Sequence, residues 1–205
     1  MTSSELLVTF NEEKKRNRNG KLFIISGTTA CGKNTLINRV LKDDMGLTLI
    51  PSFVTRGMRD GESQGNPYIF MSEEEFMKLV NNNEMFEYEN VHKGVYYGTH
   101  QKTYEYAVEN GYDVIKDIDV NGAEKYKEHF KEKAILIFIK TSTKEVLRQR
   151  IVDRHGEDEE QIENRLSRVD YELSKESNYD YVVINDDLEK AVTDLEKIIR
   201  NEINA

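Results

Sequence analysis

One stretch near the N-terminus restricts the folds open to this chain. Residues 26–36 have the sequence SGTTACGKNTL, in which Gly27, Gly32 and Lys33 follow the spacing G-x-x-x-x-G-K-[ST]. An apolar run, KLFIIS, precedes the glycines, and a helical pattern begins near Asn34. A glycine-rich turn between a strand and a helix directs backbone N–H groups at an anion. The segment therefore predicts a polyphosphate-binding loop, although Asn34 stands where the pattern has Ser or Thr and Thr35 follows one place later.

The rest of the chain alternates between β-rich apolar runs and helical periods. Strands are predicted over 112–119, 134–140 and 179–185, and helices over 120–130, 143–154, 159–176 and from about Leu188 onward. A further helix is predicted to begin near Ser72, because Ser72 and Glu75 have the spacing of a capping box. This alternation indicates βαβ units, and so an α/β fold with a parallel sheet that helices cover on both faces.

Composition narrows the class of partner. The 205 residues carry a formal net charge of -9, which argues against a general nucleic-acid binder. A small anionic substrate is still compatible with this charge, because a few arginines can form a local positive cleft. The single cysteine suits a reducing compartment, and we expect a cytoplasmic protein without a membrane partner.

A second candidate anion site lies in residues 51–70, PSFVTRGMRDGESQGNPYIF. Arg56 and Arg59 are three residues apart, and Tyr68 follows. Two guanidinium groups and a phenol hydroxyl suit a phosphate monoester, which they can bind through bidentate and neutral hydrogen bonds. Two solvated surface arginines would give the same pattern, so this stretch alone leaves both interpretations open.

Further motifs favour the phosphate-binding interpretation. The segments TRGMRDGE, NPYIF, EMFEYENVHKGVYYGTH and VIKDIDVNG occur in an order that resembles the guanylate kinase family, nucleoside monophosphate kinases that phosphorylate GMP from ATP. The resemblance extends from about Lys21 to the C-terminus. It implies a three-layer P-loop kinase core with a parallel sheet, a small mixed α/β GMP-binding subdomain and a helical lid. Residues 1–20 are polar apart from the short run LLVTF, and their composition predicts a solvated, flexible lead-in. The resemblance implies a kinase domain over 21–205, with the core at 21–46, 101–150 and 170–205, the GMP-binding subdomain at about 47–100 and the lid at about 150–169.

The resemblance also implies roles for individual residues. The phosphate loop predicts ATP contacts at Gly27, Thr28, Thr29, Ala30, Cys31, Gly32, Lys33, Asn34 and Thr35, and the resemblance adds Asn185. The GMP phosphate would contact Arg56, Arg59, Tyr68 and Tyr97, with Tyr96 as the alternative to Tyr97, and the guanine ring would contact Ser52, Glu87, Thr99 and Asp119. The catalytic cations would be Lys33, Arg56, Arg150, Arg154 and Arg165. Mg²⁺ would be held by Asn34 or Thr35, or by the nucleotide and water alone, and through water by Asp117.

The expected function is phosphorylation of GMP, with dGMP as a further acceptor, by direct in-line transfer from ATP with Mg²⁺ as cofactor. The expected partners are these nucleotides, and the expected state is a monomer or a weak homodimer. Two alternatives remain: a catalytically weak protein-interaction module with this fold, and a kinase for another nucleoside monophosphate. The intact loop glycines and Lys33 argue against the first, and Glu87 and Asp119 together with Ser52 argue against the second.

Overall fold

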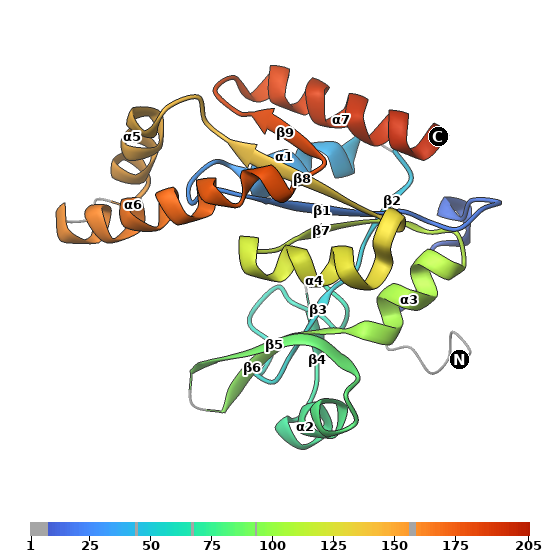
Figure 1. Cartoon of the computed structure of the whole chain (residues 1–205). Coiled ribbons are helices and arrows are strands. Elements are labelled where there is room, and N and C mark those ends of the chain that lie inside the picture. Colours follow the sequence, from blue (N-terminus) through green and yellow to red (C-terminus); the bar gives the residue numbers. More distant parts are fainter. Residues whose placement is uncertain (1–7, 44, 67, 93, 156–158) are drawn as a thin grey trace. The chain divides into compact units, whose positions relative to one another are not determined.

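The structure is a computed structural model that describes residues 8–43, 45–66, 68–92, 94–155 and 159–205 (Figure 1). For residues 92, 153–155, 159–162, 164 and 165 the description covers the backbone and not the side chain. The chain divides into two compact units. The smaller unit comprises Met1–Gly20 and Thr48–Val114, and the larger comprises Lys21–Leu47 and Ile115–Ala205. The helix at 101–109 therefore belongs to the smaller unit, whereas the sequence-based ranges end the GMP-binding subdomain at about 100.

A five-stranded sheet has the strand order β2-β7-β1-β8-β9. Its strands are β1 (Leu22–Gly27), β2 (Leu47–Leu49), β7 (Asp113–Asp117), β8 (Ala134–Lys140) and β9 (Tyr181–Ile184). β1 pairs with β8, and β8 with β9, in parallel. Every residue of β1 is buried, as helix-covered parallel strands require. The predicted parallel sheet is thereby confirmed.

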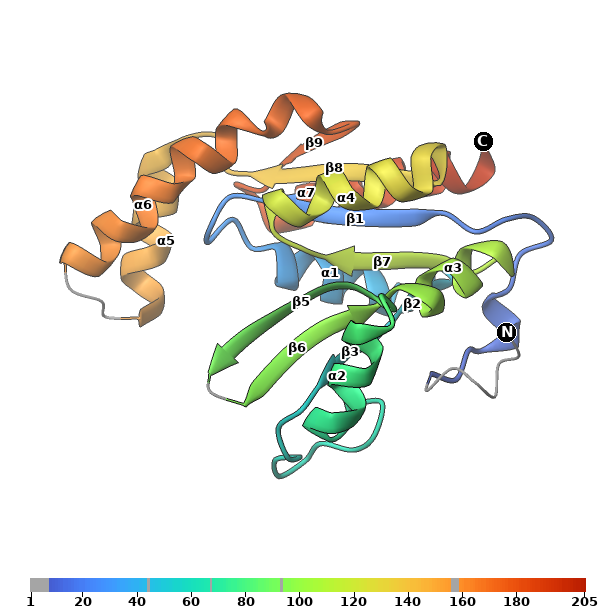
Figure 2. The ribbon, with the colours of Figure 1, turned by 60° about the horizontal axis from the view of Figure 1, so that its bottom comes forward.

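Helices cover both faces of this sheet. The covering helices are α1 (Lys33–Lys42), α4 (Val120–Phe130) and α7 (Leu188–Asn204), and the larger unit also contains α5 (Lys144–His155) and α6 (Glu159–Ser174). Figures 1 and 2 show α1 and α7 on one face of β1 and β8, and α4 on the other. Between α1, α7 and the sheet lies a core of buried aliphatic side chains that includes Ile25, Leu36, Ile137 and Leu195. The predicted bounds of α4 and β8 coincide with the observed ones, because both elements have an uninterrupted local pattern.

The smaller unit contains a mixed four-stranded sheet with the order β4-β3-β6-β5. Its elements are β3 (Ser52–Val54), β4 (Tyr68–Phe70), α2 (Glu73–Asn81), β5 (Met85–His92), β6 (Val95–His100) and α3 (Gln101–Glu109). β3 and β4 are parallel, whereas β6 is antiparallel to both β3 and β5. The predicted capping box is present, since Ser72 accepts from the Glu75 N–H and the Glu75 carboxylate accepts from the Ser72 N–H.

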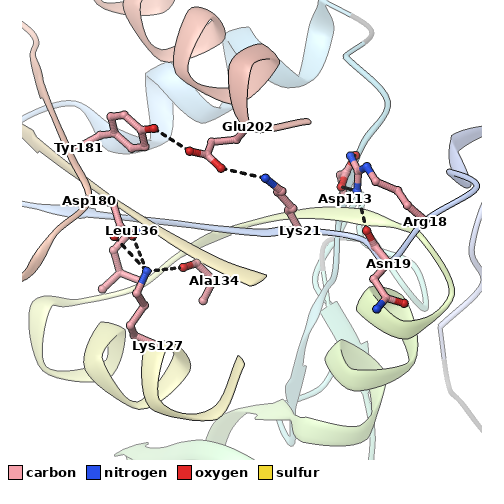
Figure 3. A network of polar contacts seen from close by, with 10 residues as sticks. All are labelled: Arg18, Asn19, Lys21, Asp113, Lys127, Ala134, Leu136, Asp180, Tyr181 and Glu202. Atoms are coloured by element: carbon pink, nitrogen blue, oxygen red, sulfur yellow. Dashed lines mark hydrogen bonds and ion pairs between the residues drawn. The ribbon is translucent and has the colours of Figure 1, made fainter. Parts of the chain in front are cut away.

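Two features of the smaller unit differ from the expectation. The lead-in was expected to be solvated, yet the Phe10 ring lies 4.8 Å from the Tyr112 ring and Arg18 binds the carboxylate of buried Asp113 (Figure 3). Helix α3 was not predicted, although Tyr104, Ala107 and Val108 have helical spacing and are all buried. Residues 8–20 therefore pack as part of the fold.

Within the described part of the chain, no helix combines the length and the apolar character needed to cross a bilayer.

Candidate active site

The loop between β1 and α1 owes its path to two glycines. Gly27 has φ +145° and Gly32 has φ +90°, conformations that L side chains rarely adopt. A Cβ on Gly27 would lie 1.9 Å from the carbonyl oxygen of Ile139. A Cβ on Gly32 would lie 2.6 Å from Nδ2 of Asn185. Both positions of the sequence pattern are thus required by backbone geometry.

Lys33 lies at the first turn of α1 and points back over the loop. Its Nζ donates to the carbonyl oxygens of Gly27, at 3.3 Å, and Thr28, at 3.4 Å. The ammonium group is therefore held at the mouth of a turn whose N–H groups precede a helix N-terminus, where the helix dipole favours negative charge.

A cavity of about 640 Å³ opens beside this loop. It is lined by Ala30, Cys31, Gly32, Lys33, Asn34, Thr35, Asp117, Arg150, Asn185 and Leu188. All of these except Leu188 were predicted from the sequence as ATP, metal or catalytic residues. Gly27, Thr28 and Thr29, which were also predicted, are in the loop and are not among the lining residues.

Three segments remote in sequence meet at the main chain of Cys31. Nδ2 of Asn185 donates to the Cys31 carbonyl at 2.7 Å, and Nη1 of Arg150 donates to the same oxygen at 3.3 Å. Nη2 of Arg150 also donates to the Asn185 carbonyl at 2.7 Å. These bonds fix the cavity wall formed by α5 and by the end of β9. The Asn185 Oδ1 is buried and has no hydrogen-bond partner within the described part of the chain.

Cys31 itself is completely buried in the core of the larger unit. Burial raises the pKa of its thiol, although the nearby Lys33 ammonium opposes this effect. The side chain is therefore a neutral thiol that fills space, and what Cys31 offers the cavity is its main chain.

Asp117 ends β7 and presents its carboxylate to the cavity. Partial loss of hydration beside the surrounding protein disfavours the charged form and raises the pKa of this carboxyl, while the positive charge of Lys33 acts to lower that pKa. Among the described residues, no cluster of three or more His, Cys, Asp or Glu side chains could hold a metal ion. The oxygen donors of Asn34, Thr35 and Asp117 in one cavity do suit Mg²⁺, which usually takes few protein ligands and keeps several waters.

The two remaining candidate lid residues, Arg154 and Arg165, belong to α5 and α6, but their side chains lie outside the described residues.

In the smaller unit, Arg56 is the centre of a preorganised cluster. Its Nη1 and Nη2 donate to the Glu62 carboxylate at 2.6 and 2.7 Å, and its Nε donates to the Tyr97 hydroxyl at 3.1 Å. The guanidinium also lies over the Tyr68 ring, 5.3 Å from the ring centre. Hydrogen bonds from Arg56 and from the Arg59 N–H lower the pKa of Glu62 to about 2. The predicted residues Arg56, Tyr68 and Tyr97 are thus brought together.

Tyr96, the alternative to Tyr97, has a different environment. Its ring stacks on Phe76 at 5.6 Å, and its N–H donates to the Thr55 hydroxyl. The predicted Arg59 has an exposed side chain, and its N–H donates to Glu62 at 2.8 Å.

The predicted base-contacting residues divide between the two units. Glu87 and Thr99 face each other across β5 and β6, and the Thr99 hydroxyl donates to the Glu87 carboxylate at 3.2 Å. Ser52 pairs with Tyr68 across β3 and β4. Asp119 belongs to the larger unit, where its Oδ1 caps α4 by accepting from the N–H groups of Asn121 and Gly122.

Sequence reasoning missed two carboxylates of these sites. Glu62 binds Arg56, and the buried Glu172 binds Thr29. The position of Glu62 within the TRGMRDGE motif was a usable signal. The sequence carried no such signal for Glu172, because an acidic residue on a highly charged helix is expected to be exposed to solvent.

An α/β core in which the first strand leads through a glycine loop into a helix, with a cavity at that loop, defines a phosphate-loop nucleotide-binding protein. Comparison with known proteins gives the family. The model of the family described as "Guanylate kinase" matches residues 19–202. The chain belongs to the guanylate kinase family.

Individual relatives agree with this assignment. The guanylate kinase of Fusobacterium nucleatum is 40% identical over 184 residues, covering 90% of this chain and 98% of the relative. That of Neisseria gonorrhoeae is 41% identical over 182 residues, covering 89% and 88%. The crystal structure of guanylate kinase from Anaplasma phagocytophilum superposes with a TM-score of 0.66 at 31% identity, covering 90% of this chain and 87% of that one.

Proposed function

We propose that this protein transfers the γ-phosphoryl group of ATP to GMP, and also to dGMP, giving ADP and the nucleoside diphosphate. The observation that carries the proposal is the intact loop cavity, in which Gly32, Lys33 and Arg150 all line one space of about 640 Å³. A family member that served only as a protein-interaction module would have no need of this cavity. The described residues supply both the loop and the cations that a triphosphate requires.

On the donor side, the N–H groups of residues 28–35 would surround the phosphates, and Lys33 would reach the β- and γ-phosphates. Asn185, whose Oδ1 is buried without a partner in the described residues, would contact the adenine base. Arg150, together with Arg154 and Arg165, would neutralise charge on the transferred group as the lid closes. Closure would also exclude water that could otherwise accept the phosphoryl group.

On the acceptor side, Arg56, Arg59, Tyr68 and Tyr97 would hold the GMP phosphate. The stacked, hydrogen-bonded arrangement of Arg56 supports this role, because a fixed guanidinium loses little freedom on binding. The guanine edge would meet Glu87 and Asp119 as acceptors from N1–H and N2–H, and Ser52 and Thr99 as hydroxyl contacts. Adenine lacks this pattern and would leave polar groups unpaired, which is a large penalty.

Mg²⁺ would be held by Asn34 or Thr35 and, through water, by Asp117. When bound with the nucleotide it would neutralise charge on the phosphates. The transfer requires no general base, because the nucleophile is a phosphate oxygen and the second pKa of a phosphate monoester is about 6. The protein's contribution is therefore alignment and charge stabilisation by Lys33 and the arginines.

The test is a coupled assay of ADP release with MgATP and, separately, GMP, dGMP, AMP, CMP and UMP. Turnover with GMP and dGMP, and little with the other three, is the expected result. Turnover with no acceptor would leave the interaction module as the better interpretation. Preference for AMP would contradict the base contacts while sparing the phosphate loop.

A further inference from the structure

The phosphate loop has a contact that the roles above do not use. Glu172, near the C-terminal end of α6, is 8% exposed. Its Oε2 accepts from the N–H of Thr29 at 2.7 Å, and its Oε1 accepts from the Thr29 hydroxyl at 3.0 Å. One carboxylate thus binds both donors of a loop residue that lies 143 positions earlier in the sequence.

The part of α6 that carries Glu172 is held in place by packing against the core. Val169 is completely buried, and Leu166 and Leu173 pack against the core of the larger unit. One turn beyond, Asn178 and Lys175 bind the Glu124 carboxylate of α4. The C-terminal half of α6 is therefore anchored on the core, and Glu172 presents its carboxylate to the loop from a rigid base.

A buried carboxylate next to an anion-binding loop needs an explanation. Burial of a carboxylate is costly unless the charged group accepts hydrogen bonds, and a negative charge at this place would repel phosphate. Both donors of Thr29 satisfy the carboxylate. Without it, the Thr29 N–H would lose its acceptor and the loop between Thr28 and Gly32 would lose its tie to α6.

We propose that Glu172 is a positioning residue for the phosphate loop, which it holds through Thr29 in the conformation that binds ATP. The proposal rests on the ATP site proposed above, and Glu172 itself does not contact the nucleotide. An ordered loop binds triphosphate without an ordering cost at the moment of binding. The same tie joins the loop to the C-terminal end of α6, the helix whose first part lies in the proposed lid.

The test compares Glu172→Ala with Glu172→Gln and with Asp170→Asn. Gln can accept from the Thr29 N–H and donate to the Thr29 hydroxyl, so it preserves the contact without the charge. Asp170 is the matched control, because it is on the same helix and its side chain is 69% exposed. The measurements are the dissociation constant of a fluorescent ATP analogue without acceptor, the KM values for ATP and GMP, and the unfolding temperature.

Glu172→Ala is expected to weaken binding of the ATP analogue about tenfold and to raise the KM for ATP similarly, with the KM for GMP unchanged within about twofold. Glu172→Gln is expected to stay within about threefold of the wild type, and Asp170→Asn to match it. If Glu172→Ala lowers the unfolding temperature but binds the analogue like the wild type, the residue is merely structural and the proposal is wrong. An equal rise in both KM values would also overturn it.

Glu172→Asp is the second variant if Glu172→Ala does not fold. Its carboxylate is one methylene shorter, so it keeps the charge but reaches the Thr29 donors less well than Glu172→Gln does, and it is expected to bind the analogue about fivefold more weakly than Glu172→Gln. Equal binding by Glu172→Asp and Glu172→Gln would contradict the proposal. Because analogue binding is measured without acceptor, absence of GMP phosphorylation would refute the proposed function and leave this result standing.

Discussion

Gly27 and Ala30 illustrate how much a single position in the phosphate loop matters. Ala30 has φ +59°, in the left-handed region that costs a non-glycine residue about 1–2 kcal/mol. Gly27 has φ +145° and lies against the Ile139 carbonyl. The chain thus keeps glycine where a side chain would collide with backbone and accepts strain where there is room.

We predict opposite outcomes for substitutions at these two positions. Gly27→Ala should destabilise the fold by at least about 2 kcal/mol, because neither the strand nor Ile139 can move away. Ala30→Gly should change stability by less than about 1 kcal/mol, because relief of strain and the greater entropy of the unfolded chain oppose each other. Chemical denaturation measures both, and equal losses would contradict the geometric argument.

Asn34 is the departure from the loop pattern, and Asn34→Ser tests what it costs. If the Asn34 side chain contacts Mg²⁺ less well than a hydroxyl, kcat should rise by about threefold and half-saturation should need less Mg²⁺. The measurement is initial rate against Mg²⁺ concentration at fixed ATP. Unchanged values would indicate that the metal does not rely on this side chain.

Glu62 gives a pH dependence whose sign follows from its partners. Arg56 and Arg59 hold its folded-state pKa at about 2, below the unfolded value of 4.5. The stabilisation is therefore complete above the unfolded pKa and is lost as pH falls toward the folded one. The stability difference between wild type and Glu62→Gln should be constant near neutral pH and should shrink as the pH falls from about 4.5 toward 2. A difference that is independent of pH would rule out this linkage.

At the scale of elements, α5 gives the cavity one of its walls. Arg150 on this helix binds the carbonyls of Cys31 and Asn185, whereas the Arg148 side chain, 40% exposed, pairs with Glu163. Of these two arginines on one helix, Arg150 therefore supports the cavity wall, whereas Arg148 forms an ion pair with the neighbouring helix α6.

We predict that Arg150→Ala lowers kcat at least about tenfold and raises the KM for ATP, because the cavity loses both a cation and the support of its wall. The KM for GMP should change by less than about twofold. Arg148→Ala is the matched control and should leave the kinetics unchanged. An unaltered kcat for Arg150→Ala would remove this helix from the catalytic site.

At the scale of the whole molecule, each of the two units consists of two segments that are distant in sequence. Within each unit, polar contacts join its two segments. In the larger unit, Lys21 donates to Glu202 at 2.9 Å, and the same carboxylate accepts from the Tyr181 hydroxyl at 2.6 Å (Figure 3). In the smaller unit, Arg18 binds Asp113 through two bonds of 2.9 and 3.0 Å. Each unit therefore combines two separate segments of the chain.

We predict that Arg18→Ala destabilises the protein by about 2 kcal/mol, because the carboxylate of Asp113 is completely buried and would lose its bidentate partner. Arg39→Ala breaks a surface pair with Glu189 and should cost less than about 0.5 kcal/mol. Thermal unfolding of both variants is the measurement. Equal effects would show that the Arg18–Asp113 pair contributes no more to stability than a surface ion pair.

The sequence by itself determined the features that depend only on residues close together in the chain, namely the phosphate loop and the longer helices and strands. Glycine spacing predicted the loop, because a backbone position with positive φ favours glycine whatever packs around it. Helical and strand periods predicted α4 and β8, because those elements are long enough to show a period. The residues 51–70 predicted a phosphate site through motif resemblance, while their strands, β3 and β4, are three residues each and too short for a periodic signal.

Only the tertiary structure decided which side chains meet. Arg56 reaches Tyr97 across 41 positions, and Glu172 reaches Thr29 across 143. The sequence shows Glu172 as one acid among many on a charged helix. Its burial and its two hydrogen bonds exist only once α6 is anchored on the core. The local sequence pattern determines the backbone conformation. The environment of a charged side chain depends instead on the residues that pack around it, and for Glu172 these include Thr29, 143 positions earlier in the chain.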